Sequence, residues 1–173
     1  VSDLSPAAIT DAQPGSIAQL AANDNELQAR IPEGLPSVIA ERFKRLGQHS
    51  LLWRAVNKQL TERLTAQRHG LFLQRHAQGT LLRGGRGAGK SMALAATVAW
   101  ARQQGWLVVY VPSAFQMCNL GGMLRRSRLQ PDCFDQPQLA QKMCSDLVAA
   151  HEAELAKLPI KRSMLVLPEF PMS

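Results

Sequence analysis

Residues 84–91 constrain the fold of this 173-residue chain more than any other feature of its sequence. They read GGRGAGKS and follow the pattern G-x-x-x-x-G-K-[ST] of the phosphate-binding loop, or P-loop. Glycines let the backbone of such a loop curl so that successive N–H groups point at one phosphate. Lys90 is expected to reach the β- and γ-phosphates of a nucleotide, and the Ser91 hydroxyl to bind Mg²⁺. The pattern therefore predicts a nucleotide site at the start of a helix.

The sequence on either side of this loop agrees with that interpretation. Residues 79–82 form a short, mainly apolar run, as expected of a strand that leads into the loop. Residues 92–99 are Ala-rich with apolar positions at helical spacing, and Gly105 marks the end of this helix. Residues 106–111 are continuously apolar and predict a strand buried in a parallel sheet. The alternative, a glycine-rich turn that binds nothing, is disfavoured by this order of strand, loop, helix and strand.

The composition is that of a folded and basic protein. Hydrophobic residues make up 46% of the chain, the formal net charge is +7, and no apolar run is long enough to predict a membrane span. No Asp or Glu occurs between residues 63 and 131, and a stretch of one sign favours a polyanionic partner. Arg125, Arg126 and Arg128 exceed the needs of a nucleotide, so we interpret them as candidate contacts to an RNA backbone. A solvated basic loop is the alternative for each of them.

The chain divides into three regions. Residues 1–30 are small and polar with weak periodicity, which predicts an extended N-terminal arm that orders against a partner. Residues 31–78 predict a helical lead-in, and residues 79–173 an incomplete P-loop core. The expected fold class is therefore α/β, a truncated P-loop (AAA+-like) nucleotide-binding domain with a helical lead-in and an extended arm. We expect its sheet to be small or to be completed by sequence outside this chain.

Local signals place the other elements. A helix is expected to open at Pro36 and to end at Gly47, and a second helix to start at Ser50, which suits an N-cap. Pro137 is expected to open a later helix whose apolar positions form one buried stripe. Residues 164–167 are a short strand candidate.

Two further patterns bear on chemistry. Hydrolysis of a triphosphate needs an acid near the Mg²⁺ and a group that orients the attacking water. The one acid that follows an apolar run after the loop is Glu169, and Pro168 breaks that strand end, so the sequence predicts nucleotide binding without predicting turnover. Asn57-Lys58 resembles the start of the N/T-K-x-D guanine loop of Ras-type GTPases. It lacks the Asp and precedes the P-loop, so we assign it no role in base recognition.

Several motifs in sequence order resemble one family. Residues 31–36 (IPEGLP) resemble its proline-bounded entry segment, and residues 84–91 its P-loop. Residues 104–112 (QGWLVVYVP) are similar to its strand, and residues 134–140 (FDQPQLA) to the start of a later helix. Over residues 31–158 the chain is thus similar to the death-associated protein 3 family of mitochondrial small-subunit ribosomal proteins.

The resemblance implies an AAA+-related P-loop domain in the head of the mitoribosomal small subunit, and hence a place in the mitochondrial matrix. It implies GTP or GDP with Mg²⁺ as ligand, ATP being the alternative. The implied partners are small-subunit rRNA, neighbouring proteins of the head and bridge contacts to the large subunit. The family continues with a strand that carries an Asp and a helical C-terminal region, and neither is in this sequence. Carried over by position, the nucleotide-binding residues are Gly84, Gly85, Arg86, Gly87, Ala88, Gly89, Lys90, Ser91 and Met92.

Two other functions remain as alternatives. The chain could be the N-terminal fragment of an ATPase of the AAA+ or signal-transduction type, which a longer reading frame with an acidic strand end would favour. A small-molecule kinase would need a lid and an acidic acceptor site, and the sequence predicts neither.

Overall fold

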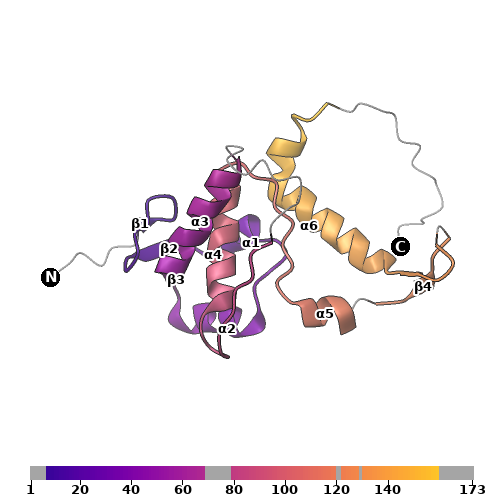
Figure 1. Cartoon of the computed structure of the whole chain (residues 1–173), viewed down its shortest axis with the longest axis horizontal. Coiled ribbons are helices and arrows are strands. Elements are labelled where there is room, and N and C mark those ends of the chain that lie inside the picture. The colour runs from indigo at the N-terminus through magenta and orange to yellow at the C-terminus, as the bar shows by residue number, and fades with distance from the viewer. Residues whose placement is uncertain (1–6, 69–78, 120–121, 129, 160–173) are drawn as a thin grey trace.

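The computed structural model describes residues 7–68, 79–119, 122–128 and 130–159 (Figure 1). These residues form a mixed helix-and-sheet structure with one three-stranded and one two-stranded sheet. The elements in chain order are β1 (Ala7–Ala8), β2 (Ile17–Ala21), α1 (Asp24–Arg30), α2 (Ser37–Leu46), β3 (His49–Leu52), α3 (Ala55–Arg68), α4 (Lys90–Gln103), α5 (Ala114–Asn119), β4 (Arg125–Arg126), β5 (Phe134–Asp135) and α6 (Pro137–Leu155).

The larger sheet is built mostly from the segment predicted to be an extended arm. β2 is its central strand, parallel to β1 and antiparallel to β3, with Ile17 opposite Leu52. Ala18 and Leu20 alternate on one face of β2 and are completely buried. The prediction of an arm was therefore wrong for the described part of residues 1–30. The polar composition of residues 1–30 gave no strong strand signal, because β2 buries one face through only a few apolar side chains.

The second lead-in helix begins later than predicted. Ser50, expected to be its N-cap, pairs with Gln19 in the sheet as part of β3. The helix α3 starts at Ala55, where the Asn57 side chain accepts a hydrogen bond from the Arg54 backbone N–H at 3.1 Å. Pairing with β2 has overridden the local capping signal, because a capping preference contributes only about 1 kcal/mol.

The helices with strong local signals occur where the sequence predicts them. α2 follows Pro36 and ends at Gly47, which adopts the left-handed conformation (φ 61°) that favours glycine. α4 begins at Lys90, and α6 begins at Pro137. Each prediction rested on a proline or glycine at a helix end, and each is confirmed.

The core lies between the larger sheet and the helices that follow it. α3 and α4 lie side by side, and the Ala-rich face of α4 lets the two backbones approach closely (Figure 1). The buried cluster joins the sheet, α2, α4 and the segment after α4. Its members are Ile9, Ala12, Ala18, Leu20, Ile31, Ile39, Phe43, Leu51, Trp53, Ala96, Val98, Ala99 and Tyr110.

Neither residues 79–82 nor residues 106–111 belong to a strand of the described structure, so both strand predictions were wrong. Residues 106–111 nevertheless alternate: Tyr110 is 5% exposed, whereas Val109 is 64% exposed. A strand exists only when a second backbone pairs with it, and among the described residues none does so here.

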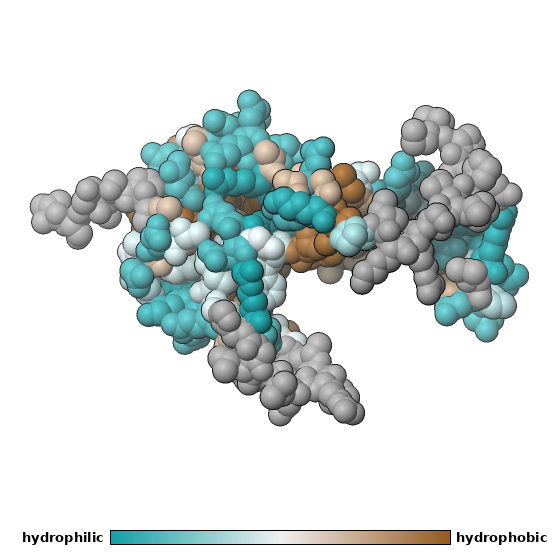
Figure 2. Space-filling model, turned by 90° about the horizontal axis from the view of Figure 1, so that it is seen from above, coloured by the Kyte–Doolittle hydropathy of each residue, from teal (hydrophilic) through white to brown (hydrophobic). Residues whose placement is uncertain are grey.

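Figure 2 shows a hydrophobic patch near the middle of a mostly hydrophilic surface.

The chain after residue 112 contains more structure than the loop that the sequence predicted. It forms the short helix α5 and a hairpin in which β4 and β5 pair antiparallel. α6 carries its predicted stripe only half-buried, and bends at His151. The predicted strand at residues 164–167, and Glu169, lie outside the described residues. None of the described helices is long and apolar enough to cross a membrane.

Candidate functional site

The segment that leads into α4 has the backbone geometry of a tight loop. Gly84, Gly87 and Gly89 have φ angles of 154°, 82° and 80°, in the region that favours glycine. Gly89 is the N-cap of α4, and its carbonyl accepts the first intrahelical hydrogen bond, from the Ala93 N–H at 2.9 Å. The N–H groups of the residues before Ala93 in α4 have no acceptor within the helix. They offer donors to an anion, and the positive end of the helix dipole adds to them.

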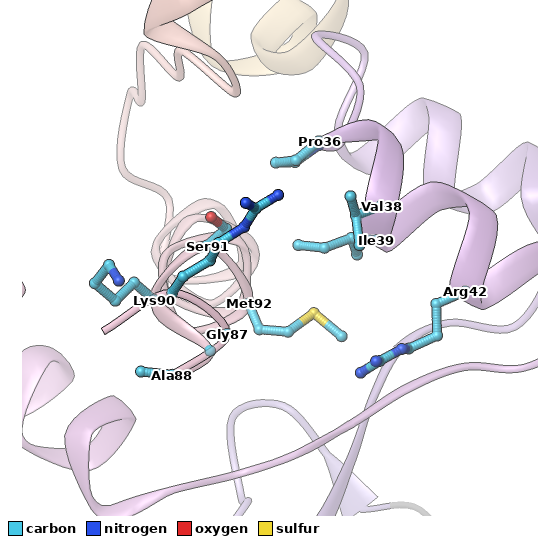
Figure 3. Close-up of a pocket in the computed structure, with 11 residues that line it drawn as sticks. Pro36, Val38, Ile39, Arg42, Gly87, Ala88, Lys90, Ser91 and Met92 are labelled. Carbon is cyan, nitrogen blue, oxygen red and sulfur yellow. The ribbon is translucent and has the colours of Figure 1, made fainter. Parts of the chain in front are cut away.

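Lys90 folds back over this loop. Its Nζ donates hydrogen bonds to the carbonyl oxygens of Gly84 and Gly85, both at 2.8 Å. Figure 3 shows the Lys90 side chain on the side of α4 away from α2. The ammonium group therefore bridges two carbonyl oxygens of the loop. A bound phosphate could replace these carbonyls as the acceptor of its hydrogen bonds.

A second layer of contacts comes from the start of α3. The Arg54 guanidinium donates to the Ala88 carbonyl at 2.6 Å, and a Cβ placed on Gly89 would lie 2.6 Å from Arg54 Nη1. The buried Asn57 amide donates to the Ala93 carbonyl at 3.2 Å. Arg54 and Asn57 thus tie the loop and the first turn of α4 to α3, and the φ angle of 80° favours glycine at position 89.

A cavity of about 380 Å³ opens between the loop and α2 (Figure 3). This volume is within the range of small-molecule sites. Met92 extends from α4 toward α2, and Arg42 extends from α2 toward Met92. The cavity is lined by Pro36, Val38, Ile39, Arg42, Arg86, Gly87, Ala88, Gly89, Lys90, Ser91 and Met92.

The polar side chains of this cavity are nearly all cationic. Arg42, Arg86 and Lys90 carry positive charge, and Ser91 adds a hydroxyl group. Among the described residues that line the cavity, none carries a carboxylate. The described part of the chain also holds no cluster of three or more His, Cys, Asp or Glu side chains that could bind a metal ion. The cavity therefore suits an anionic ligand with an apolar portion.

A buried ion pair braces the structure at the other end of α4. Arg102 of α4 donates to both carboxylate oxygens of Glu33, and each side chain is less than a tenth exposed. Arg102 also donates to the carbonyls of Arg30 and Val108. The Tyr110 hydroxyl is buried nearby without a hydrogen-bond partner. Burial, reinforced by the Glu33 charge, raises the pKa of Tyr110 to about 12.

The structure brings residues 84–92 together but separates them from the arginines predicted to contact RNA. Arg125, Arg126 and Arg128 lie in the hairpin region, at the end of the molecule opposite the larger sheet (Figure 1). Arg125 and Arg126 are exposed strand residues. Arg125 pairs with Asp135 across the hairpin, whereas Arg126 pairs with Phe134, which is 64% exposed.

Sequence reasoning did not find the α2 wall of the cavity or the contacts from α3. The members it missed are Pro36, Val38, Ile39, Arg42, Arg54 and Asn57. They reach the loop from more than 30 residues away along the chain, and no local pattern in the sequence signals such contacts. Asn57 in particular donates a hydrogen bond to the first turn of α4. The resemblance of Asn57-Lys58 to a guanine-binding motif did not suggest this contact.

Comparisons with known proteins give one finding. No curated protein matches the chain. The family model described as mitochondrial ribosomal death-associated protein 3 matches residues 51–169, which is more than half of the chain and includes the loop and α4. The chain therefore belongs to the mitochondrial ribosomal death-associated protein 3 family, whose members are ribosomal proteins of the mitochondrial matrix.

Proposed function

We propose that this chain is a constituent of the small subunit of the mitochondrial ribosome that holds GTP or GDP in the cavity at residues 84–92 and contacts rRNA through the β4–β5 hairpin. The loop and its helix carry the proposal. Glycines with positive φ, a lysine over the loop and free N–H groups at the start of α4 form an anion site beside an apolar wall. A P-loop domain related to AAA+ proteins is the fold that fits this function.

The cavity offers Mg²⁺ one side-chain oxygen ligand and no carboxylate among its described lining residues. Ser91, the second residue of α4, supplies the hydroxyl oxygen among the cavity's described side chains. Mg²⁺ keeps several waters and is often held by one or two protein oxygens together with phosphate oxygens. Ser91 would therefore hold the ion with the help of the nucleotide, and the ion would neutralise part of the phosphate charge. The role of the protein in this proposal is retention of the nucleotide.

The hairpin arginines are the proposed RNA contacts. They lie in the acid-free stretch of the sequence and on a different surface from the nucleotide cavity. A ribosomal protein needs cationic groups that neutralise phosphates, and arginine also stacks on unpaired bases. Contacts to neighbouring proteins of the small-subunit head, and bridge contacts to the large subunit, belong to the same proposal.

Nucleotide binding is tested by titrating the full chain with fluorescently labelled GDP. Lys90→Ala should weaken binding at least tenfold, because it removes the cation over the loop and hydrogen bonds to charged groups contribute about 1.5–3 kcal/mol each. Lys58→Ala is the matched control, since Lys58 is an exposed lysine on α3 that pairs with Glu62 at 3.9 Å.

The expected result is normal binding by the control and weak binding by the Lys90 variant. Equal affinities of the wild-type protein and the Lys90→Ala variant would refute the proposed site. Lys90-dependent release of phosphate from ATP would instead favour the ATPase alternative.

A further inference from the structure

The cavity beside the loop has two chemically different ends. This inference rests on the proposed function, which places phosphates at residues 84–91. The other end is apolar: Pro36, Val38 and Ile39 from the start of α2 face Met92 from α4 (Figure 3). Val38 is 73% exposed, and a flat ring placed in the cavity would cover such a side chain. The base of a bound nucleotide therefore belongs at the α2 end.

Arg42 is the polar side chain at this apolar end. It lies one helical turn after Val38 and Ile39, and in Figure 3 its guanidinium points toward Met92. Its guanidinium makes no hydrogen bond or ion pair with any described residue. Its neighbour Arg45 differs, because Arg45 pairs with Glu41 at 3.8 Å and does not line the cavity. Arg42 is thus a cation that the described fold leaves available to a ligand.

The donor character of Arg42 selects between purine bases. A guanidinium has five N–H donors and no acceptor. A base with a carbonyl at C6 offers two adjacent acceptors, O6 and N7, which match this fork, whereas adenine places an amino group beside N7. The other charged groups of the cavity, Arg86 and Lys90, are donors as well. The cavity therefore provides little to accept a hydrogen bond from the adenine amino group.

We infer that Arg42 is a specificity-determining residue, which reads the O6/N7 edge of a 6-oxopurine nucleotide from the α2 wall. Guanine and hypoxanthine nucleotides share this edge and adenine nucleotides lack it, so Arg42 distinguishes the first two from the third. The lead-in helix thereby has a role in ligand choice as well as in packing.

The test compares three unlabelled nucleotides, GDP, IDP and ADP, as competitors of a fluorescent nucleotide bound to the full chain. Wild-type protein should bind GDP and IDP with similar affinity and ADP more weakly. Arg42→Ala should weaken GDP and IDP by about 10- to 100-fold, the loss of one bidentate pair, while ADP binding stays within about twofold. Arg45→Ala, the matched control on the same helix, should leave all three affinities unchanged.

A second variant separates base reading from charge. Arg42→Lys keeps the cation but lacks the planar fork, so it should lose most of the preference for GDP over ADP. It also decides the question if Arg42→Ala does not fold, which circular dichroism will show. Equal weakening of GDP and ADP would overturn the inference, because it would make Arg42 a phosphate contact. Unchanged affinities would overturn it too.

Failure of the proposed function gives a different pattern. In that case wild-type and Lys90→Ala proteins would fail to bind any of the three nucleotides. Strong binding that depends on Lys90 but ignores Arg42 would remove only the role of Arg42.

Discussion

At the scale of single residues, buried polar groups connect distant segments around the C-terminal end of α4. Arg102 joins the end of α4 to Glu33, to the Arg30 carbonyl and to the Val108 carbonyl. Since both charges of the pair are buried, removal of either partner would leave the other charge uncompensated. Tyr110 packs into the same region with its hydroxyl unpaired. The contacts of Arg102 connect the segment after α4 to the start of the lead-in region.

Tyr110 gives this region a measurable pH dependence. Its pKa is raised from the usual value of 10 to about 12, so the folded state favours the neutral phenol. The resulting stability is complete below about pH 10 and is lost as the pH rises toward 12. Tyr110 is the single tyrosine of the chain, so tyrosinate absorbance reports its ionisation directly. We expect a midpoint near 12 in the folded protein, and a midpoint near 10 would contradict the burial of this hydroxyl.

The same side chain predicts the effect of one substitution. Tyr110→Phe should leave stability at neutral pH unchanged or raise it by about 1 kcal/mol, because it removes a buried hydroxyl that has no partner. It should also flatten the fall of the unfolding free energy between pH 10 and 12 relative to the wild-type protein. Urea unfolding at several pH values measures both effects.

At the scale of elements, predictability followed the range of the interactions. Helices that end at Gly47 or begin at Pro137 have their signals within a few residues, so the sequence predicts them. Strand β3 forms only by pairing with β2, which is distant in the sequence. The residues around Ser50 therefore predict a helix cap, although Ser50 pairs with Gln19 in the sheet. For the candidate site, the loop was foreseeable because its glycines and lysine are contiguous. Arg42 and Arg54 were not, since only the tertiary fold brings them to it.

The β4–β5 hairpin allows the proposed RNA contacts to be ranked. Asp135 stands across the hairpin from Arg125 and offsets its charge, whereas Arg126 stands across from an aromatic ring. Arg126 therefore presents both a cation and a stacking surface to RNA on one face.

Singly and together, the hairpin arginines should change RNA binding in a graded way. With a single-stranded RNA oligonucleotide as probe, Arg126→Ala should weaken binding and reduce the slope of log affinity against log salt by about one. Arg125→Ala should have a smaller effect on both quantities, and Arg45→Ala on α2 serves as control. Replacement of Arg125, Arg126 and Arg128 together should flatten the salt dependence most. A triple variant with an unchanged slope would exclude the hairpin as an RNA contact.

At the scale of the whole molecule, the cavity and the hairpin form two separate surfaces. The candidate cavity lies where α2 meets the start of α4, and the hairpin lies at the far end of the molecule (Figure 1). The acid-free stretch of residues 63–131 contains both the loop and strand β4, so it brings cationic side chains to both surfaces. Such an arrangement allows a nucleotide and an RNA to be bound at the same time without competing for one set of side chains. It suits a protein that joins components of a large ribonucleoprotein particle.

The most direct test of this account is the nucleotide content of mitochondrial ribosomal small subunits that contain this chain. Subunits are purified, denatured, and the released nucleotides identified by chromatography, with particles carrying Lys90→Ala analysed in parallel. GTP or GDP should be released from the wild-type particles, and this fraction should disappear with Lys90→Ala. Equal release of purine nucleotide from both particles, or release from neither, would contradict the proposed function.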